Sequence, residues 1–159
     1  MSSGPVHLTS AIYLVRGLPG AGKSTTATAM ARGVEYALVY SADDFFCMNE
    51  SGEYRFDRFR LPQAHAWCQA RTRDALADGR PVFVANTFTE RWEMEPYIQI
   101  AKEWNIQLIV IDIYDGGMND RELSINNVHG VPQETITAMR NRWQHDWRSG
   151  DPRAPWERG

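Results

Sequence analysis

The chain contains 159 residues with a formal net charge of −3, and 43% of its residues are hydrophobic. This size and composition predict one globular domain with its own core, and the charge provides no overall attraction to nucleic acid. Two cysteines are too few for a disulfide framework, and no run of about twenty apolar residues suits a membrane span. We therefore expect a cytoplasmic protein with no membrane partner, and nothing in the sequence implies a protein partner.

The first motif along the chain is a glycine-rich loop. Residues 17–24 read GLPGAGKS and match the phosphate-loop pattern G-x-x-x-x-G-K-[ST]. The apolar run before them, residues 11–15, predicts a buried strand, and residues 24–32 predict a helix that ends at Gly33. A strand, a glycine loop and a helix in this order are typical of a phosphate-binding site. A glycine-rich turn without a ligand is the alternative.

Each residue type in this loop suits a phosphate for its own reason. Glycines let the backbone curl until its N–H groups point at an anion, and the following helix adds the positive end of its dipole. Lys23 supplies a mobile positive charge for the phosphates. The hydroxyl of Ser24 is an oxygen ligand that suits Mg²⁺.

Apolar runs alternate with helix-like segments along the rest of the chain. This alternation predicts an α/β fold in which crossover helices connect the strands of a parallel sheet. We expect the domain to span residues 1–148, followed by a flexible tail over residues 149–159. The predicted strands are residues 11–15, 36–40, 81–85 and 107–113.

Further helices are predicted after the second, third and fourth strands. Gly79 closes a helix over residues 62–78, which a proline opens. Thr89 is a possible N-cap of the next helix, which Pro96 could kink. A last helix begins near Pro132 and is expected to bury Ile136, Met139 and Trp143.

Two carboxylates follow the second predicted strand. Asp43 and Asp44 open a predicted loop over residues 43–60, and a second loop is predicted over residues 115–130. In open parallel sheets, ligands bind beyond the carboxyl ends of the strands, so both loops should border the phosphate site. One Asp could accept the proton of an attacking hydroxyl, and one could help to hold magnesium. A polar pair that caps a helix is the alternative.

Six segments of the chain form an ordered set of motifs. They are residues 17–24, 41–46, 52–56, 64–67, 86–88 with 92–97, and 127–132. In these segments the chain resembles polynucleotide-kinase-type P-loop kinases, a group that also includes the kinase-like domain of a NEDD-binding protein. The resemblance covers residues 11–147 and implies a three-layer P-loop kinase fold with a parallel sheet flanked by helices.

The resemblance also implies an activity and its cofactors. It predicts a kinase that uses ATP with Mg²⁺ and transfers a phosphoryl group to a hydroxyl, often on nucleic acid. Asp43 is then the general base. Asp43 and Ser24 are also the residues expected to bind the metal, and Lys23 is expected to contact the transferring phosphate. The residues expected to contact ATP are Leu18, Pro19, Gly20, Ala21, Gly22, Lys23, Ser24 and Thr25.

The chain departs from this family at three points. Family members tend to carry arginines just before the Asn-x-His-Gly stretch, where this chain has Ile125 and Asn126. Arg121 is therefore predicted to stabilise the transferring phosphate, with Arg140 as a second candidate and a solvated surface charge as the alternative. An arginine that helps to hold the acceptor is replaced by Phe46. Ala85 stands where an acidic residue often ends the third strand.

The predicted acceptor site combines aromatic and basic side chains. Arg55 or Arg58 could replace the missing arginine. Aromatic rings beside guanidinium groups are typical of sites that grip single strands or extruded bases. The residues expected at the acceptor are Asp44, Phe46, Arg55, Arg58, Asn86 and Thr87.

The predicted function is transfer of the γ-phosphoryl group of ATP to a hydroxyl on nucleic acid, with DNA favoured. The acceptor is a hydroxymethylated pyrimidine in DNA or a 5′-hydroxyl end. Three alternatives stay open: a small-molecule kinase, a nucleotide-dependent switch or binding module without transfer, and an interaction protein with a relic loop.

Overall fold

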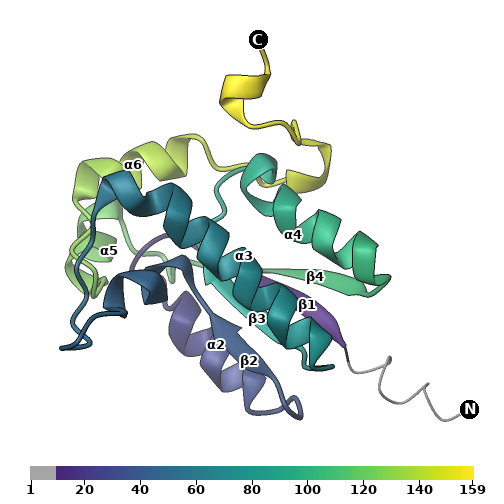
Figure 1. Cartoon of the computed structure of the whole chain (residues 1–159). Coiled ribbons are helices and arrows are strands. Elements are labelled where there is room, and N and C mark those ends of the chain that lie inside the picture. Colours follow the sequence, from purple (N-terminus) through teal and green to yellow (C-terminus); the bar gives the residue numbers. More distant parts are fainter. Residues whose placement is uncertain (1–9) are drawn as a thin grey trace, which may run out of the picture.

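A parallel sheet of four strands forms the centre of the structure, a computed structural model that describes residues 10–159 (Figure 1). The strand order is β2-β3-β1-β4, and every neighbouring pair is parallel, so all carboxyl ends meet at one edge. Residues 1–9, where the predicted domain begins, lie outside the described residues. The strands are β1 (Ala11–Arg16), β2 (Leu38–Tyr40), β3 (Val82–Asn86) and β4 (Gln107–Asp112).

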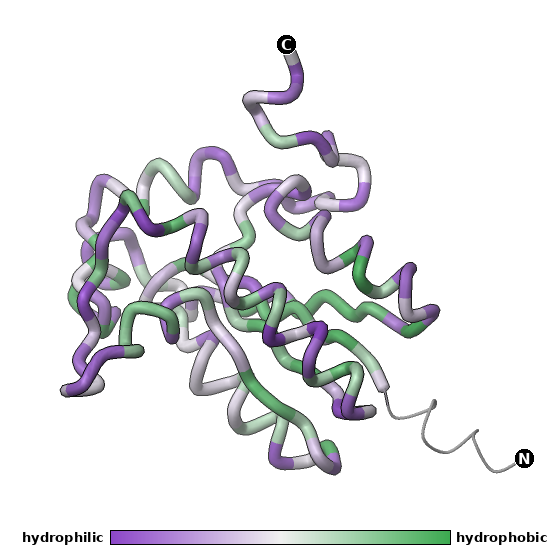
Figure 2. The backbone as a smooth tube through the Cα atoms, in the orientation of Figure 1, coloured by the Kyte–Doolittle hydropathy of each residue, from purple (hydrophilic) through white to green (hydrophobic). Residues whose placement is uncertain are grey.

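Helices cover both faces of the sheet and complete three layers. Ile12 and Val84 face a buried cluster with side chains of α3 and α4, whereas Val15 and Phe83 pack with Ala27 of α2 on the opposite face. The strands are the most continuously hydrophobic segments of the chain (Figure 2). This arrangement confirms the predicted three-layer α/β fold. The helices are α2 (Lys23–Ala31), α3 (Leu61–Ala77), α4 (Arg91–Trp104), α5 (Asp120–Asn126) and α6 (Gln133–Asn141).

Helices α5 and α6 lie together beyond the carboxyl ends of the strands (Figure 1), and we call them the lid. Ile136 of α6 is fully buried, and Met139 and Trp143 pack on the same cluster. The predicted start of the last helix and the burial of Ile136 are confirmed, whereas Met139 and Trp143 are only partly buried and Trp143 lies after the helix, which ends at Asn141.

The prediction of a loop over residues 115–130 is wrong in part, because α5 lies inside it. A reciprocal capping box fixes the start of this helix. The Asn119 side chain accepts the Glu122 N–H at 2.9 Å, and the Glu122 carboxylate accepts the Asn119 N–H at 3.0 Å. Two N–H groups that a helix start would leave unpaired are thereby satisfied.

Residues 43–60 also contain short helices where a loop was predicted. The 3₁₀ helices Ala42–Cys47 and Arg58–Arg60 lie at either end of that stretch. Strand β2 begins at Leu38, two residues later than predicted, because Tyr36 has a φ of 62° that no strand allows.

The start of α4 also differs from the prediction. Glu90 is its N-cap, and Thr89 instead donates its hydroxyl hydrogen to a Glu93 carboxylate oxygen at 2.6 Å. The helix continues through Pro96 without a break.

The last residues of the chain contact α4. The ring of Trp156 lies 5.4 Å from that of Trp92, and the flexibility of residues 149–159 stays a prediction. Within residues 10–159, no helix combines the length and the apolar character that a bilayer crossing needs.

Candidate active site

The glycine loop joins β1 to α2 at the carboxyl edge of the sheet. Gly20 and Gly22 have φ angles of 84° and 92°, in the left-handed region that glycine tolerates best. Gly22 is also the N-cap of α2, where no side chain caps the helix and no acidic residue lies in the first turn. The first N–H groups of α2 are therefore left without side-chain partners, which is the arrangement that binds an anion.

Lys23 brings an ammonium group to this loop. It forms no ion pair with any residue that the structure describes. Desolvation lowers the pKa of Lys23 below its ordinary value, and attraction to Asp43 opposes this shift. A desolvated cation without a counter-ion favours the binding of an anion such as phosphate.

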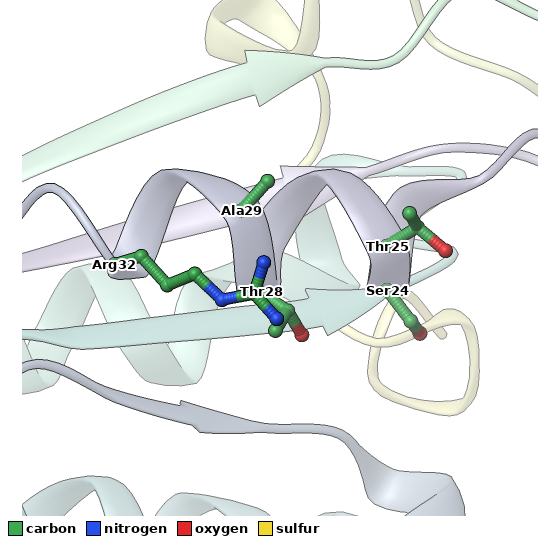
Figure 3. Close-up of a pocket in the computed structure, with 5 residues that line it drawn as sticks. All are labelled: Ser24, Thr25, Thr28, Ala29 and Arg32. Atoms are coloured by element: carbon green, nitrogen blue, oxygen red, sulfur yellow. The ribbon is translucent and has the colours of Figure 1, made fainter.

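Ser24 and Thr25 lie at one end of a groove along the exposed side of α2, and Arg32 lies at the other end (Figure 3). Within the described residues, Ser24 forms no hydrogen bond through its hydroxyl, which leaves that oxygen available to a metal. Residues 10–159 contain no cluster of three or more His, Cys, Asp or Glu that could hold a metal ion. The free Ser24 hydroxyl fits one oxygen ligand of a Mg²⁺ ion whose remaining ligands would come from the phosphates of a nucleotide and from water.

Helix α5 rests directly on the glycine loop. A Cβ atom added to Gly20 would lie 2.2 Å from the carbonyl oxygen of Leu123. The Asn126 side chain donates a hydrogen bond to the Gly20 carbonyl at 2.6 Å. Leu18 joins Leu123 and Ile136 in a buried cluster, so its side chain anchors the lid.

Gly20→Ala is expected to lower the free energy of unfolding by about 2–4 kcal/mol, because the methyl group overlaps the Leu123 carbonyl and the left-handed φ strains any side chain. Gly22→Ala is the matched control, since its φ is also positive but an added Cβ has nothing within 4 Å. Strain alone predicts a loss of about 1–2 kcal/mol there. Urea denaturation of both variants measures the difference, and equal losses would contradict the close seating of α5.

The 3₁₀ helix Ala42–Cys47 is a short turn after β2 that carries both predicted carboxylates. Ser41 caps this 3₁₀ helix, because its hydroxyl accepts the Asp43 N–H at 3.2 Å and its own N–H donates to Asp44 at 2.9 Å. Asp44 therefore caps this short helix, which is the structural role that the sequence left open as an alternative for the two carboxylates. Burial raises the pKa of the Asp44 carboxyl, and the hydrogen bond from Ser41 opposes that shift. Its contact with an acceptor stays a prediction.

Asn86, at the end of β3, holds this turn in place. Its Oδ1 atom accepts hydrogen bonds from the Ala42 N–H at 2.9 Å and from the Ser41 hydroxyl at 3.3 Å. Its Nδ2 atom is buried without a hydrogen-bond partner in the described part of the chain. Asn86 thus positions the segment that carries Asp43, and Thr87 beside it is half-buried; the acceptor contacts of both stay predictions.

Asp43 meets side chains from two distant segments. The Tyr54 hydroxyl donates to Oδ1 at 3.3 Å, and Nε2 of His129 lies 3.5 Å from Oδ2. Burial and the nearby Asp43 carboxylate both raise the pKa of Tyr54, so its hydroxyl remains a hydrogen-bond donor. The Asp43 side chain is still 38% exposed, which leaves it accessible to a substrate.

The segment after this turn exposes aromatic and basic side chains. Phe56 and Phe59 are 52% and 80% exposed. Arg58 lies over the Phe59 ring at 4.9 Å, and exposed Arg55 lies 3.6 Å from Glu53. Both predicted arginines are therefore exposed to solvent, Arg58 against the Phe59 ring and Arg55 beside Glu53.

Three other residues that were predicted to act in the site differ in burial and in their contacts. Phe46 is buried in an aromatic cluster, so its contact with an acceptor stays a prediction. Arg121 is exposed in the first turn of α5 and has no hydrogen bond or ion pair among residues 10–159, so its charge is available to a ligand. Arg140 instead pairs with Asp115 at 2.9 Å and Asp120 at 2.7 Å, which fastens α6 to the start of α5.

Arg16 is a residue that sequence reasoning missed. It ends β1 immediately before the glycine loop and is fully buried. Its guanidinium donates to the carbonyls of Phe88 at 2.9 Å, Thr89 at 3.2 Å and Gln144 at 3.0 Å. It also lies 4.1 Å from the centre of the Trp143 ring. A charge at the end of an otherwise apolar strand was the signal in the sequence.

Solved structures with the same fold include proteins of the P-loop kinase type. A chain of the Pnkp1/Rnl/Hen1 RNA repair complex matches with a TM-score of 0.69 and 18% identity, over 91% of this chain and 49% of that one. A gluconokinase from Sinorhizobium meliloti matches with a TM-score of 0.54 and 18% identity, over 92% of this chain and 78% of that one. At these identities the likeness concerns the fold alone.

One relative is closer in sequence. NEDD4-binding protein 2 from Homo sapiens is 33% identical over 135 residues, which are 84% of this chain and 8% of that protein. The chain therefore corresponds to a small part of that relative. A family model described as AAA domain matches residues 12–144, from β1 to the segment after α6. The resemblance expected from the motifs is confirmed: the chain belongs to this AAA domain family, with the fold of a P-loop kinase.

Proposed function

We propose that the protein is an ATP-dependent phosphotransferase that moves the γ-phosphoryl group to a hydroxyl on nucleic acid. The observation that carries the proposal is a carboxylate beside an anion-binding loop. Asp43 follows β2 and Lys23 begins the helix after β1, and these two parallel strands end at the same edge of the sheet. Residues 123–129 contact both Gly20 of the loop and the Asp43 carboxylate, and attraction to Asp43 opposes the lowering of the Lys23 pKa. Phosphoryl transfer needs such a phosphate cradle and a group that can accept the acceptor's proton.

Different residues would bind the nucleotide, hold the metal and accept the proton in this reaction. The N–H groups at the start of α2 and the Lys23 ammonium bind and orient the triphosphate. Ser24, and Asp43 directly or through water, would hold Mg²⁺, whose positive charge offsets the charge on the transferring group. Asp43 accepts the proton of the acceptor hydroxyl, and Arg121 adds positive charge at the phosphate.

A nucleic-acid acceptor is supported by the exposed side chains of Arg55, Phe56, Arg58 and Phe59, which lie within five consecutive residues. Aromatic rings stack on bases of any sequence, and guanidinium groups pair with phosphates. Phe46 stands where polynucleotide-kinase-type proteins hold the acceptor with an arginine. This replacement favours a hydroxymethylated pyrimidine in DNA over a 5′-hydroxyl end.

An acceptor screen with labelled ATP tests the proposal. We expect label on DNA that contains hydroxymethyluracil, and loss of that label by about 10²–10³-fold in Lys23→Ala, because the charge on the transferring phosphate loses its partner. The screen includes 5′-hydroxyl DNA, 5′-hydroxyl RNA and gluconate. Label on gluconate alone would replace the proposal with a small-molecule kinase. Undiminished transfer by Lys23→Ala would refute the role of that residue.

A nucleotide-dependent switch is a second candidate, motivated by Ala85 at the end of β3 and by Ile125 and Asn126 in the lid. These positions lack the acidic and basic groups that the kinase family tends to place there. On this reading, ATP binds and is hydrolysed while no acceptor is labelled. ATP turnover would then be unchanged in Asp43→Asn.

A further inference from the structure

The segment that follows α5 brings a histidine to the proposed base. Nε2 of His129 lies 3.5 Å from Oδ2 of Asp43, and its ring lies 4.2 Å from that of Tyr54. Nδ1 of His129 is buried and has no hydrogen-bond partner in residues 10–159. Asp43 is therefore the polar contact that the imidazole makes in the described structure.

Asn127 fixes the turn that carries this histidine. Its Nδ2 atom donates to the carbonyls of Ser124 at 2.8 Å and Val131 at 3.2 Å. Its Oδ1 atom accepts the N–H groups of His129 at 3.2 Å and Val131 at 2.9 Å. One side chain thus holds both ends of the turn, so the position of His129 follows the position of α5.

The same stretch of chain also contacts the glycine loop. The Leu123 carbonyl lies against Gly20, and the Asn126 side chain donates to the carbonyl of Gly20. Residues 123–129 therefore connect the proposed nucleotide site to the proposed base. Such a connection would make the alignment of Asp43 depend on the seating of the lid.

We propose that His129 is a positioning residue that fixes the Asp43 carboxylate for its work on the acceptor hydroxyl, an inference that rests on the proposed function. Nε2 of the imidazole lies 3.5 Å from one carboxylate oxygen, so a small movement would let its N–H donate to that oxygen, and the Tyr54 hydroxyl donates to the other. With a contact to each oxygen from outside its own turn, Asp43 has fewer orientations open to it. A carboxylate oxygen then takes the acceptor's proton as the acceptor oxygen bonds to the γ-phosphorus and ADP leaves with the bridging oxygen.

A pair of substitutions at this position separates the N–H donor from the ring. His129→Phe keeps a ring against Tyr54 but has no donor, whereas His129→Gln keeps an N–H. With hydroxymethyluracil DNA as acceptor, kcat should fall about 10²-fold in His129→Phe while KM for ATP stays within about twofold. His129→Gln should recover most of the lost rate. A normal kcat in His129→Phe, or a rise in KM for ATP alone, would overturn the inference.

A second experiment measures the contact between His129 and Asp43 in the absence of phosphoryl transfer. In protein labelled with ¹³C at aspartate carboxyl groups, the Asp43 signal is identified by its disappearance in Asp43→Asn. We expect this signal to move in His129→Phe and to stay near its original position in His129→Gln. An unmoved signal in His129→Phe would sink the inference, whereas a wild-type protein that labels no acceptor would sink the proposed function.

Discussion

Asp43→Asn is expected to slow phosphoryl transfer by about 10²–10⁴-fold, because an amide cannot take up the proton of the acceptor hydroxyl. Asparagine keeps the size of the side chain, and the turn is held by Ser41 and Asn86 and not by the Asp43 carboxylate. The fold and the glycine loop should therefore be unaffected. Single-turnover transfer from labelled ATP measures the rate, and calorimetry measures ATP binding, which we expect to be retained.

Asp74→Asn is the matched control for this substitution. Asp74 is an exposed carboxylate of α3 that pairs with Arg71 on the surface, where such pairs contribute about 0–1 kcal/mol. Its transfer rate should equal that of the wild type. If Asp43→Asn transferred phosphate as fast as this control, Asp43 would not be the base, and an acceptor activated by another group would have to be sought.

Much of the fold could be predicted from the sequence, because the patterns that indicate strands and the glycine loop lie within short segments of the chain. The apolar runs predicted all four strands, with errors of a few residues at their ends. The motif over residues 17–24 predicted a loop between β1 and α2. Helix α5 was missed since it has only seven residues, too short for its periodicity to stand out. Asn119 and Glu122 have capping-box spacing, which could have revealed where it starts.

The surroundings of Asp43 were less accessible to sequence reasoning. Its position at the end of β2 could be predicted, because a parallel sheet gathers the ends of its strands at one edge. Its contact with His129 spans 86 positions of the chain and depends on how α5 sits on Gly20. Such a contact is set by tertiary packing, and neither residue carries a local pattern that points to the other.

Arg16 shows most clearly why burial cannot be read from residue type. An arginine at the end of a strand is usually exposed, yet this one is enclosed by Phe88, Thr89, Trp143 and Gln144. Burial lowers the pKa of Arg16, and the Asp112 carboxylate at 3.4 Å opposes that shift. Phe88, one of its carbonyl partners, has a left-handed φ of 49°. The guanidinium thus stabilises a backbone conformation that a non-glycine residue seldom adopts.

Arg16→Met is therefore expected to lower the free energy of unfolding by about 3–5 kcal/mol, since three backbone carbonyls lose a charged donor and methionine supplies none. Arg16→Lys should lose nearly as much, because one ammonium cannot reproduce the planar fork.

Arg73→Met is the control for both substitutions. Arg73 pairs with Glu103 on the surface, where such pairs contribute about 0–1 kcal/mol. Urea denaturation of the three variants measures the losses. If Arg16→Met lost no more than Arg73→Met, the buried guanidinium would not be holding the connection after β3 against the start of the phosphate loop.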